Sequence, residues 1–309
     1  MVVIPTAWLS PLVTIIPASR IYVNPFDNTI INIINIVTSM QSIQEVVHII
    51  PLGHEYDRAV KPFEERKADR VHLLSVADIT KYPEEMLERQ AHFTKKVNLQ
   101  LEGMGIRVVP HSVDLFNILE VMNAISKIIT DEKTHGNHVL VNMSACGRLT
   151  SVGATLAAMA HDATVYYMSA DDYSMNEDDF LNHGLSICER KKIIRFENFQ
   201  FVLPDKISTA ILVELCTQGR GITTKDIRNV LHVQGVPGFE KDADSIPKAS
   251  TDENQRLEKT KQLIKMEKRY LEPLERSGYI RRERSGRNNI ISITESGKYV
   301  AHISGALKN

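Results

Sequence analysis

The sequence predicts an α/β protein whose mostly parallel, helix-covered sheet is followed by a smaller helical domain that contains a β-hairpin. Short, nearly continuous apolar runs such as Val46–Pro51 alternate with amphipathic segments of helical length. Strands that are apolar throughout are typical of parallel sheets with helices on both faces. After residue 205 a helical period dominates, until two short alternating runs follow Gly278 and predict a hairpin.

The elements of the first domain are expected in a regular order. Strands are predicted at 46–51, 70–75, 106–110, 138–143 and 163–168, and helices at 58–69, 82–103, 112–130 and 150–160. Crossovers between the strands should be right-handed, which gives a Rossmann-like sheet. The run 193–203 is predicted as an extra strand or connector in which Phe196, Phe199 and Phe201 are buried.

The second domain is expected to contain three helices, the hairpin and a closing helix. The first helix covers 205–218 and is followed by two glycines. Thr223 and Asp226 match a capping box, which would begin the second helix. The helical pattern restarts at Leu257, and Pro273 should kink its final turn because proline lacks an amide hydrogen.

Two segments fall outside this pattern. The insertion 235–254, rich in Gly, Pro, Asp and Ser, is predicted to be a mobile loop. The first 39 residues hold one basic residue, Arg20, whereas a secretory signal carries its cations before its apolar run. We interpret them as an extension before a functional start at Met40; a short appended helix or strand is the alternative. The predicted domains are therefore 1–39, 40–203 and 204–309.

The composition indicates a globular protein. With 309 residues, 43% of them hydrophobic, and a net charge of −1, two domains are expected. The three cysteines, at 146, 188 and 216, are too scattered for a disulfide framework or a metal site and fit a reducing cytoplasm. The histidines show no metal-ligand spacing, and we expect no cofactor. No apolar run is long enough to cross a bilayer.

The second domain is basic, with 19 Lys and Arg against 14 Asp and Glu from residue 205 onward. A helix followed by a basic hairpin is how a winged helix holds duplex DNA: the helix enters the major groove and the wing lies along the phosphates. A solvated Lys- and Glu-rich helix is the alternative. Residues 269–300 resemble the recognition helix, wing and closing helix of archaeal and bacterial winged helix-turn-helix regulators. The expected DNA-binding residues are Lys265, Lys268, Arg269, Arg281, Arg282, Arg284 and Arg287.

Two loops in the first domain are candidates for a ligand site, at 51–58 and 142–150. Both follow predicted parallel strands, whose carboxyl ends meet at one edge of a sheet, where ligands gather. The second loop offers small residues, hydroxyls and Arg148 at a helix N-terminus, which suits a phosphate or another anion. It is neither a P-loop nor GxGxxG, and a plain strand-to-helix turn is the alternative.

These two loops, fused to a C-terminal winged helix, resemble the CARF family of CRISPR-associated Rossmann-fold sensors and the archaeal regulators built on them. The resemblance implies a pocket across a homodimer interface and, where a ligand is known, a cyclic oligoadenylate. The ligand-binding residues that it implies are Gly53, His54, Tyr56, Asn142, Ser144, Gly147, Arg148 and Thr150. The run of Gly and Thr common in the family's second loop is replaced here by 145–148, so a related regulator with another effector is the alternative.

Enzyme activity is the rival interpretation. Cys146 near a helix N-terminus could be a nucleophile with His54 as its base. Ring-cleaving CARF proteins imply that Ser144 and Arg148 could position a 2′-hydroxyl for attack on phosphate. The acidic run 171–179 could bind a divalent cation, but a solvated loop is favoured. We predict a cytoplasmic, homodimeric, ligand-responsive DNA-binding transcription regulator without catalytic residues, with a ring nuclease as the alternative.

Overall fold

The computed structural model describes residues 44–76, 82–199, 202–240, 253–285 and 288–307. The predictions for the first 39 residues, the start at Met40, Phe201 and most of the 235–254 insertion therefore lie outside the described residues. Among the described residues, no helix is long and apolar enough to cross a membrane.

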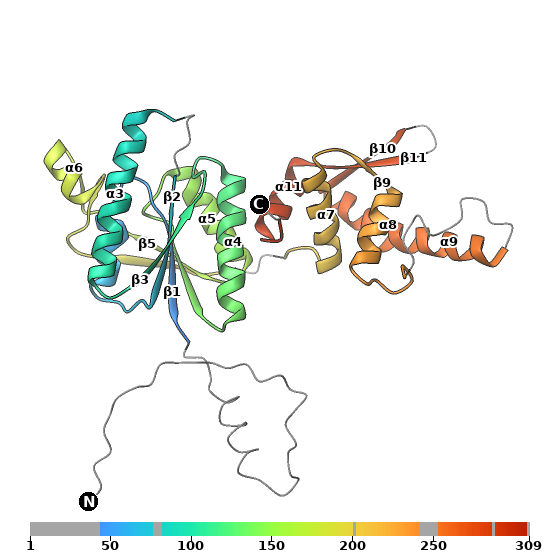
Figure 1. Ribbon diagram of the computed structural model, residues 1–309, viewed down its shortest axis with the longest axis horizontal. Coiled ribbons are helices and arrows are strands. Elements are labelled where there is room, and N and C mark those ends of the chain that lie inside the picture. Colours follow the sequence, from blue (N-terminus) through green and yellow to red (C-terminus); the bar gives the residue numbers. More distant parts are fainter. Residues whose placement is uncertain (1–43, 77–81, 200–201, 241–252, 286–287, 308–309) are drawn as a thin grey trace, which may run out of the picture. The chain divides into compact units, whose positions relative to one another are not determined.

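A six-stranded sheet forms the centre of the first domain (Figure 1), and its strand order is β3-β2-β1-β4-β5-β8. The bounds are β1 (Val46–Pro51), β2 (Arg70–Ser75), β3 (Arg107–Ser112), β4 (His138–Asn142), β5 (Thr164–Met168) and β8 (Ile193–Phe196). The first five strands are parallel and β8 is antiparallel to β5. The predicted α/β fold with a mostly parallel sheet is confirmed.

Helices cover both faces of this sheet (Figure 1): α4 (Ile118–Thr134) and α5 (Arg148–Ala160) pack on one face, and α2 (Asp57–Val60) and α3 (Glu84–Gly103) on the other. Successive strand residues point to opposite faces, so Ile49 packs under α4 and α5 while Ile50 packs under α3. Gly153 lets α4 and α5 approach closely, because a Cβ there would lie 3.1 Å from Ile118 Cγ1. Continuous apolar strands are therefore required by burial on both sides.

A small excursion follows β5 and packs against the first-strand loop. It consists of β6 (Asp172–Tyr173), α6 (Glu177–His183) and β7 (Ser186–Ile187). Gly184 has a φ of +81°, and a Cβ there would lie 2.6 Å from the Tyr56 amide nitrogen. Only glycine fits so close an approach. The acidic run 171–179 is therefore largely part of β6 and α6. Among the described residues, no cluster of His, Cys, Asp and Glu could hold a metal ion.

Three sequence-based predictions for this domain are wrong in detail. The helix expected at 58–69 is limited to α2 and a 3₁₀ turn at Lys61–Phe63, in which Pro62 lacks an amide hydrogen. The helix expected from residue 112 begins only at Ile118, because Asn117 is its N-cap. Phe196 is 40% exposed and Phe199 62% exposed, so the side chains around the edge strand β8 are not buried.

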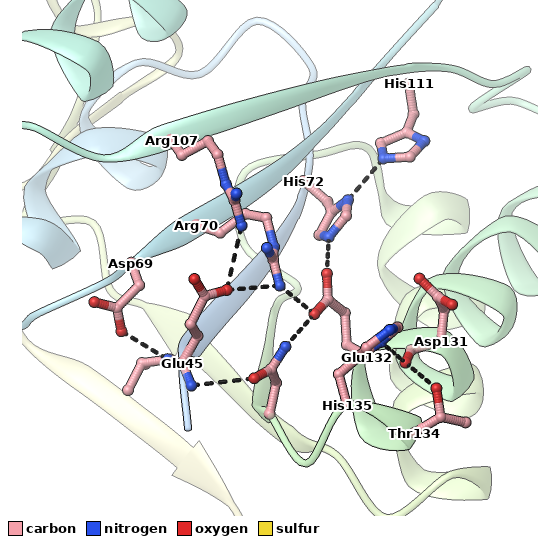
Figure 2. A network of polar contacts seen from close by, with 12 residues as sticks. Glu45, Asp69, Arg70, His72, Arg107, His111, Asp131, Glu132, Thr134 and His135 are labelled. Atoms are coloured by element: carbon pink, nitrogen blue, oxygen red, sulfur yellow. Dashed lines mark hydrogen bonds and ion pairs between the residues drawn. The ribbon is translucent and has the colours of Figure 1, made fainter. Parts of the chain in front are cut away.

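A polar network joins the first three strands to α4 (Figure 2). The Glu132 carboxylate accepts a hydrogen bond from His72 Nε2 at 2.6 Å and pairs with Arg70, which also pairs with Glu45. His72 Nδ1 lies 2.7 Å from His111 Nε2, so the two rings share one proton between them. Burial lowers the pKa of both histidines, which keeps them neutral.

The second domain is a winged helix. Its elements are α7 (Lys206–Gln218), β9 (Ile222–Thr223), α8 (Thr224–Val233), α9 (Glu253–Met266), the π-helical turn η3 (Glu267–Leu271), α10 (Glu272–Arg276), β10 (Ile280–Ser285), β11 (Asn288–Ile293) and α11 (Glu295–Ile303). The strands form one sheet in the order β10-β11-β9. Its apolar core joins α7, α8, the α9–α10 helix and α11, and includes Leu215, Ile227, Tyr270, Leu274 and Val300.

Local signals account for the ends of these helices. The predicted capping box is confirmed, since Thr223 and Asp226 each bind the other's backbone amide. Gly278 ends the long helix with a φ of +74°. The helix is irregular where a kink at Pro273 was predicted, since the π-helical turn η3 ends at Leu271, two residues before this proline. In the insertion, Val236 and Phe239 are buried in the core of this domain. The first part of the insertion is therefore ordered, and the prediction of a mobile loop is wrong for it.

Candidate ligand cavity and nucleic-acid interface

A cavity of about 430 Å³ opens where the loops after β1 and β4 meet. The Gly53 amide donates a hydrogen bond to the Ala145 carbonyl oxygen at 2.8 Å, which joins the two loops directly. The expectation that these two strand ends lie together is therefore confirmed. The lining residues are Gly53, His54, Glu55, Val76, Met86, Gln90, Leu115, Phe116, Cys146, Gly147, Arg148, Leu149, Thr150 and Leu185.

One wall of the cavity is suited to an anion. Helix α5 begins at Arg148 with Gly147 as its N-cap, and both residues are exposed. The first amides of a helix have no intrahelical acceptor and carry partial positive charge. Arg148 has no hydrogen bond or ion pair within the described parts of the chain, so its guanidinium is available. An anion bound at this wall would meet both charge and donors.

The rest of the cavity is largely apolar and aromatic. Phe116, Leu149 and Leu185 line it and are each about half exposed, so they lie at its mouth. His54 stacks on Phe93, with 6.1 Å between the ring centroids, and its Nε2 lies 3.3 Å from the Met86 carbonyl oxygen. Burial lowers the pKa of His54, so the ring is neutral. A flat, partly apolar ligand with a negative group matches these walls.

Five of the eight predicted ligand residues line the cavity: Gly53, His54, Gly147, Arg148 and Thr150. The Thr150 hydroxyl, however, donates to the Leu115 carbonyl oxygen at 2.6 Å, so it holds the loop as well as lining the cavity.

The other three, Tyr56, Asn142 and Ser144, are not in its lining. Asn142 Oδ1 accepts hydrogen bonds from the Ser144 amide and hydroxyl, and the Ser144 hydroxyl oxygen also accepts from the Met168 amide. The Tyr56 ring lies under Lys96 instead. These residues organise the strand ends that carry the cavity.

The groups considered for catalysis are held in unreactive states. The Ser144 side chain is 2% exposed and both of its hydrogen-bonding directions are used inside the protein. Burial raises the pKa of the Cys146 thiol to about 12, so it stays protonated at neutral pH. Its Sγ lies 3.5 Å from Ser151 Oγ and not beside a histidine. Neither side chain is poised as a nucleophile in this geometry.

Sequence reasoning missed several cavity residues, chiefly Glu55, Met86, Gln90, Phe116 and Leu185. Glu55 and Phe116 follow strand ends, so position alone could have suggested them. Met86 and Gln90 lie on the first turns of α3, and Leu185 on the excursion after β5. Those elements reach the cavity only through tertiary packing, for which the sequence carries no local signal.

The predicted DNA-binding residues form two groups in the winged helix. Lys268 and Arg269 are exposed on the helix that precedes the wing, whereas Lys265 Nζ donates to the Pro237 carbonyl oxygen. In the hairpin, Arg281 and Arg284 are exposed. Arg287 lies outside the described residues.

Arg282 differs from its neighbours because acidic side chains already hold it. Its guanidinium forms ion pairs with Glu267 and Glu275, both on the helix against which the hairpin packs. Side chains alternate along a strand, so Arg281 points away from this helix while Arg282 and Arg284 point toward its side. The wing arginines therefore do not present a single uniform surface.

Two family models match the chain in sequence. Residues 46–173 match the model described as HFX_2341_N-like, N-terminal, and residues 207–305 match the DUF6293 C-terminal winged helix domain. The chain therefore contains an N-terminal α/β domain that matches the first model, followed in sequence by a winged helix domain. The two matches follow the predicted order of an α/β domain and then a winged helix. No curated protein matches the chain.

Solved structures with a similar fold share little sequence. Can2 from Sulfobacillus thermosulfidooxidans, in complex with cyclic tetra-adenylate, is 11% identical with a TM-score of 0.34 over 84% of this chain and 63% of its own. VC1899 from Vibrio cholerae is 11% identical, with a TM-score of 0.35 over 83% and 64%. Csm6 from Enterococcus italicus, bound to cyclic hexa-2′-fluoro-hexa-dAMP, is 9% identical, with a TM-score of 0.38 over 76% and 59%. The chain spans less than two thirds of each, and such low TM-scores carry no weight of their own.

Proposed function

We propose that the protein is a ligand-responsive, DNA-binding transcription regulator whose cavity binds a nucleotide-derived anion such as a cyclic oligoadenylate. The observation that carries this proposal is a cavity with apolar walls and one wall formed by Arg148 and the N-terminus of α5, in a chain that also contains a winged helix. The sensor would comprise residues 40–203 and the DNA reader residues 204–309. The first ligand to test is cyclic tetra-adenylate, which is bound in the structure of Can2.

The DNA-binding part of the proposal rests on the winged helix and its exposed cations. Lys268, Arg269, Arg281 and Arg284 are exposed on the helix and the hairpin that a winged helix applies to duplex DNA. Selection from a random duplex library with the full chain would identify a preferred sequence. Failure to retain any duplex at low salt would contradict a DNA-binding role.

We also propose that the sensor forms a homodimer through the surface around the cavity mouth. Apolar side chains are exposed there and nearby, including Phe116 and Leu149, and Tyr173 and Met175 on the adjacent excursion. Contiguous exposed apolar surface usually marks an interaction site. Val152→Asp, at a half-exposed position of α5, should shift the protein toward monomer in sedimentation velocity. A wild-type chain that sediments as a monomer at micromolar concentration would contradict the dimer.

A further inference from the structure

The residues that line the cavity include one acidic residue, Glu55, in addition to the basic Arg148. Glu55 is 5% exposed and lies beside Gly53 and His54 in the first-strand loop. Its Oε1 accepts a hydrogen bond from Ser186 Oγ at 2.8 Å. Its Oε2 is buried and has no hydrogen-bond partner among the described residues. Since a buried carboxylate is normally satisfied by several donors, this oxygen is poorly solvated in the ionised state.

The cation nearest to Glu55 is shared with other groups. Arg58 Nη1 lies 3.5 Å from Glu55 Oε1, but the same guanidinium donates to the Ser144 carbonyl oxygen and to the Tyr167 hydroxyl. A second carboxylate, Asp57, lies close enough to disfavour ionisation of Glu55. Burial, the largest influence, raises the pKa of Glu55 to about 7, so its charge changes near neutral pH.

The other titratable groups around Glu55 do not compensate its charge. Asp57 is paired with Lys61 and with His183, which belongs to the excursion packed against this loop. The thiols of Cys146 and Cys188 have pKa values raised to about 12 and about 11, so both are neutral. Ionisation of Glu55 therefore places an incompletely balanced negative charge in the wall of an anion site.

We propose that the cavity takes up an anionic ligand together with a proton, which is carried by the Glu55 carboxyl group. This inference rests on the proposed ligand-binding function of the cavity. A cavity of about 430 Å³ is roughly 10 Å across, so an anion inside it would change the Glu55 protonation equilibrium on the order of tenfold. By linkage, protonation of Glu55 strengthens anion binding by the same factor. Ligand affinity should therefore decrease as pH rises through neutrality.

Calorimetric titration of the full chain with cyclic tetra-adenylate tests this coupling. The phosphodiester groups of the probe stay ionised between pH 6 and pH 9, so any proton taken up is bound by the protein. Titrations at pH 7.5 in buffers of different ionisation enthalpy should show uptake of about half a proton per site, and Kd should weaken about tenfold between pH 6 and pH 9.

Two variants isolate the group responsible. Glu55→Gln keeps the size of the side chain and should bind with the wild-type pH 6 affinity at every pH, without proton uptake. His54→Gln should keep the pH dependence, because the pKa of His54 is lowered and its ring is already neutral at pH 7.

The possible results separate this inference from the proposal on which it rests. Binding without proton uptake, or uptake that persists in Glu55→Gln, would overturn the role of Glu55 and leave the ligand site standing. If neither cyclic tetra-adenylate nor cyclic hexa-adenylate binds at any pH, both the proposed ligand class and this inference fail together. A folded Glu55→Gln variant, verified by its thermal melting curve, is the condition for either comparison.

Discussion

Arg148 provides the full positive charge at the cavity wall, at an exposed position where it supports no described structure. Arg148→Ala should weaken binding of a nucleotide anion by about tenfold or more, because a charge-assisted hydrogen bond contributes about 1.5–3 kcal/mol. The melting temperature should not change. Arg195→Ala, at an exposed arginine of β8 outside the cavity, is the matched control. Equal affinities for the wild type and Arg148→Ala, measured by calorimetry, would remove Arg148 from the site.

The raised pKa of Glu55 also has a consequence for stability that needs no ligand. A carboxyl whose pKa rises from 4.5 in the unfolded chain to about 7 in the folded chain favours the fold at low pH. That contribution is lost as pH rises from about 4.5 through about 7. Glu55→Gln should therefore gain stability relative to the wild type as pH increases, by on the order of 2–3 kcal/mol at pH 8. Urea unfolding at pH 5 and pH 8 measures this, and a pH-independent difference would contradict the buried, protonated state.

The histidines of the α4 network should act in the opposite direction. Burial lowers the pKa of His72 and His111 below the unfolded value of 6.5, so their contribution is complete above that pH. It is lost as pH falls below 6.5, because protonating both rings places two cations 2.7 Å apart. His111→Gln should reduce the loss of unfolding free energy between pH 7 and pH 5. An unchanged pH profile in that variant would show that the pair does not control acid stability.

The arginines of the wing have two different roles. Arg284 is exposed and is expected to contact DNA phosphate, whereas Arg282 forms ion pairs with the helix before the wing. Arg284→Ala should reduce the slope of log K against log salt by about 0.9, as the loss of one phosphate contact requires. Arg282→Ala should leave the slope unchanged. It should lower stability by about 1 kcal/mol, because Glu267 and Glu275 lose their partner at a partly exposed site. Filter-binding titrations at several salt concentrations separate the two, and equal slopes for both variants would contradict this division.

At the same scale, the sequence predicted most elements because each has a local cause. Continuous apolar strands, the Thr223–Asp226 capping box and Gly278 depend on periodicity and caps that are visible in the chain. The start of α4 was placed too early because its N-cap, Asn117, lies after several apolar residues that the pattern had assigned to the helix. Phe199 was expected to be buried because alternation does not reveal whether anything covers an edge strand.

The candidate site could be predicted only in part, because some of its residues are brought together by tertiary packing between different elements. The two loops follow strands, and parallel topology brings their ends together, so Gly53 and Arg148 could be found. Glu55 lies between His54 and Tyr56, yet its burial depends on the excursion that carries Ser186, far away in sequence. Tertiary packing therefore determines which residues of a predicted loop face the ligand.

The whole molecule combines a candidate ligand cavity and a winged helix in one chain. A ligand can change DNA affinity only by binding two states of the protein with different affinity. Typical coupling of about 1–3 kcal/mol corresponds to a change of roughly 5- to 150-fold in Kd. The same factor must appear in the ligand affinity when DNA is bound, since coupling between binding sites is reciprocal.

Fluorescence anisotropy of the selected duplex with the full chain, with and without saturating cyclic tetra-adenylate, measures whether ligand binding and DNA binding are coupled. We expect the ligand to change the Kd for DNA by at least about fivefold, and Arg148→Ala to abolish the change without altering DNA binding in the absence of ligand. The same Kd for DNA in both conditions, with calorimetry showing the ligand bound, would contradict this coupling.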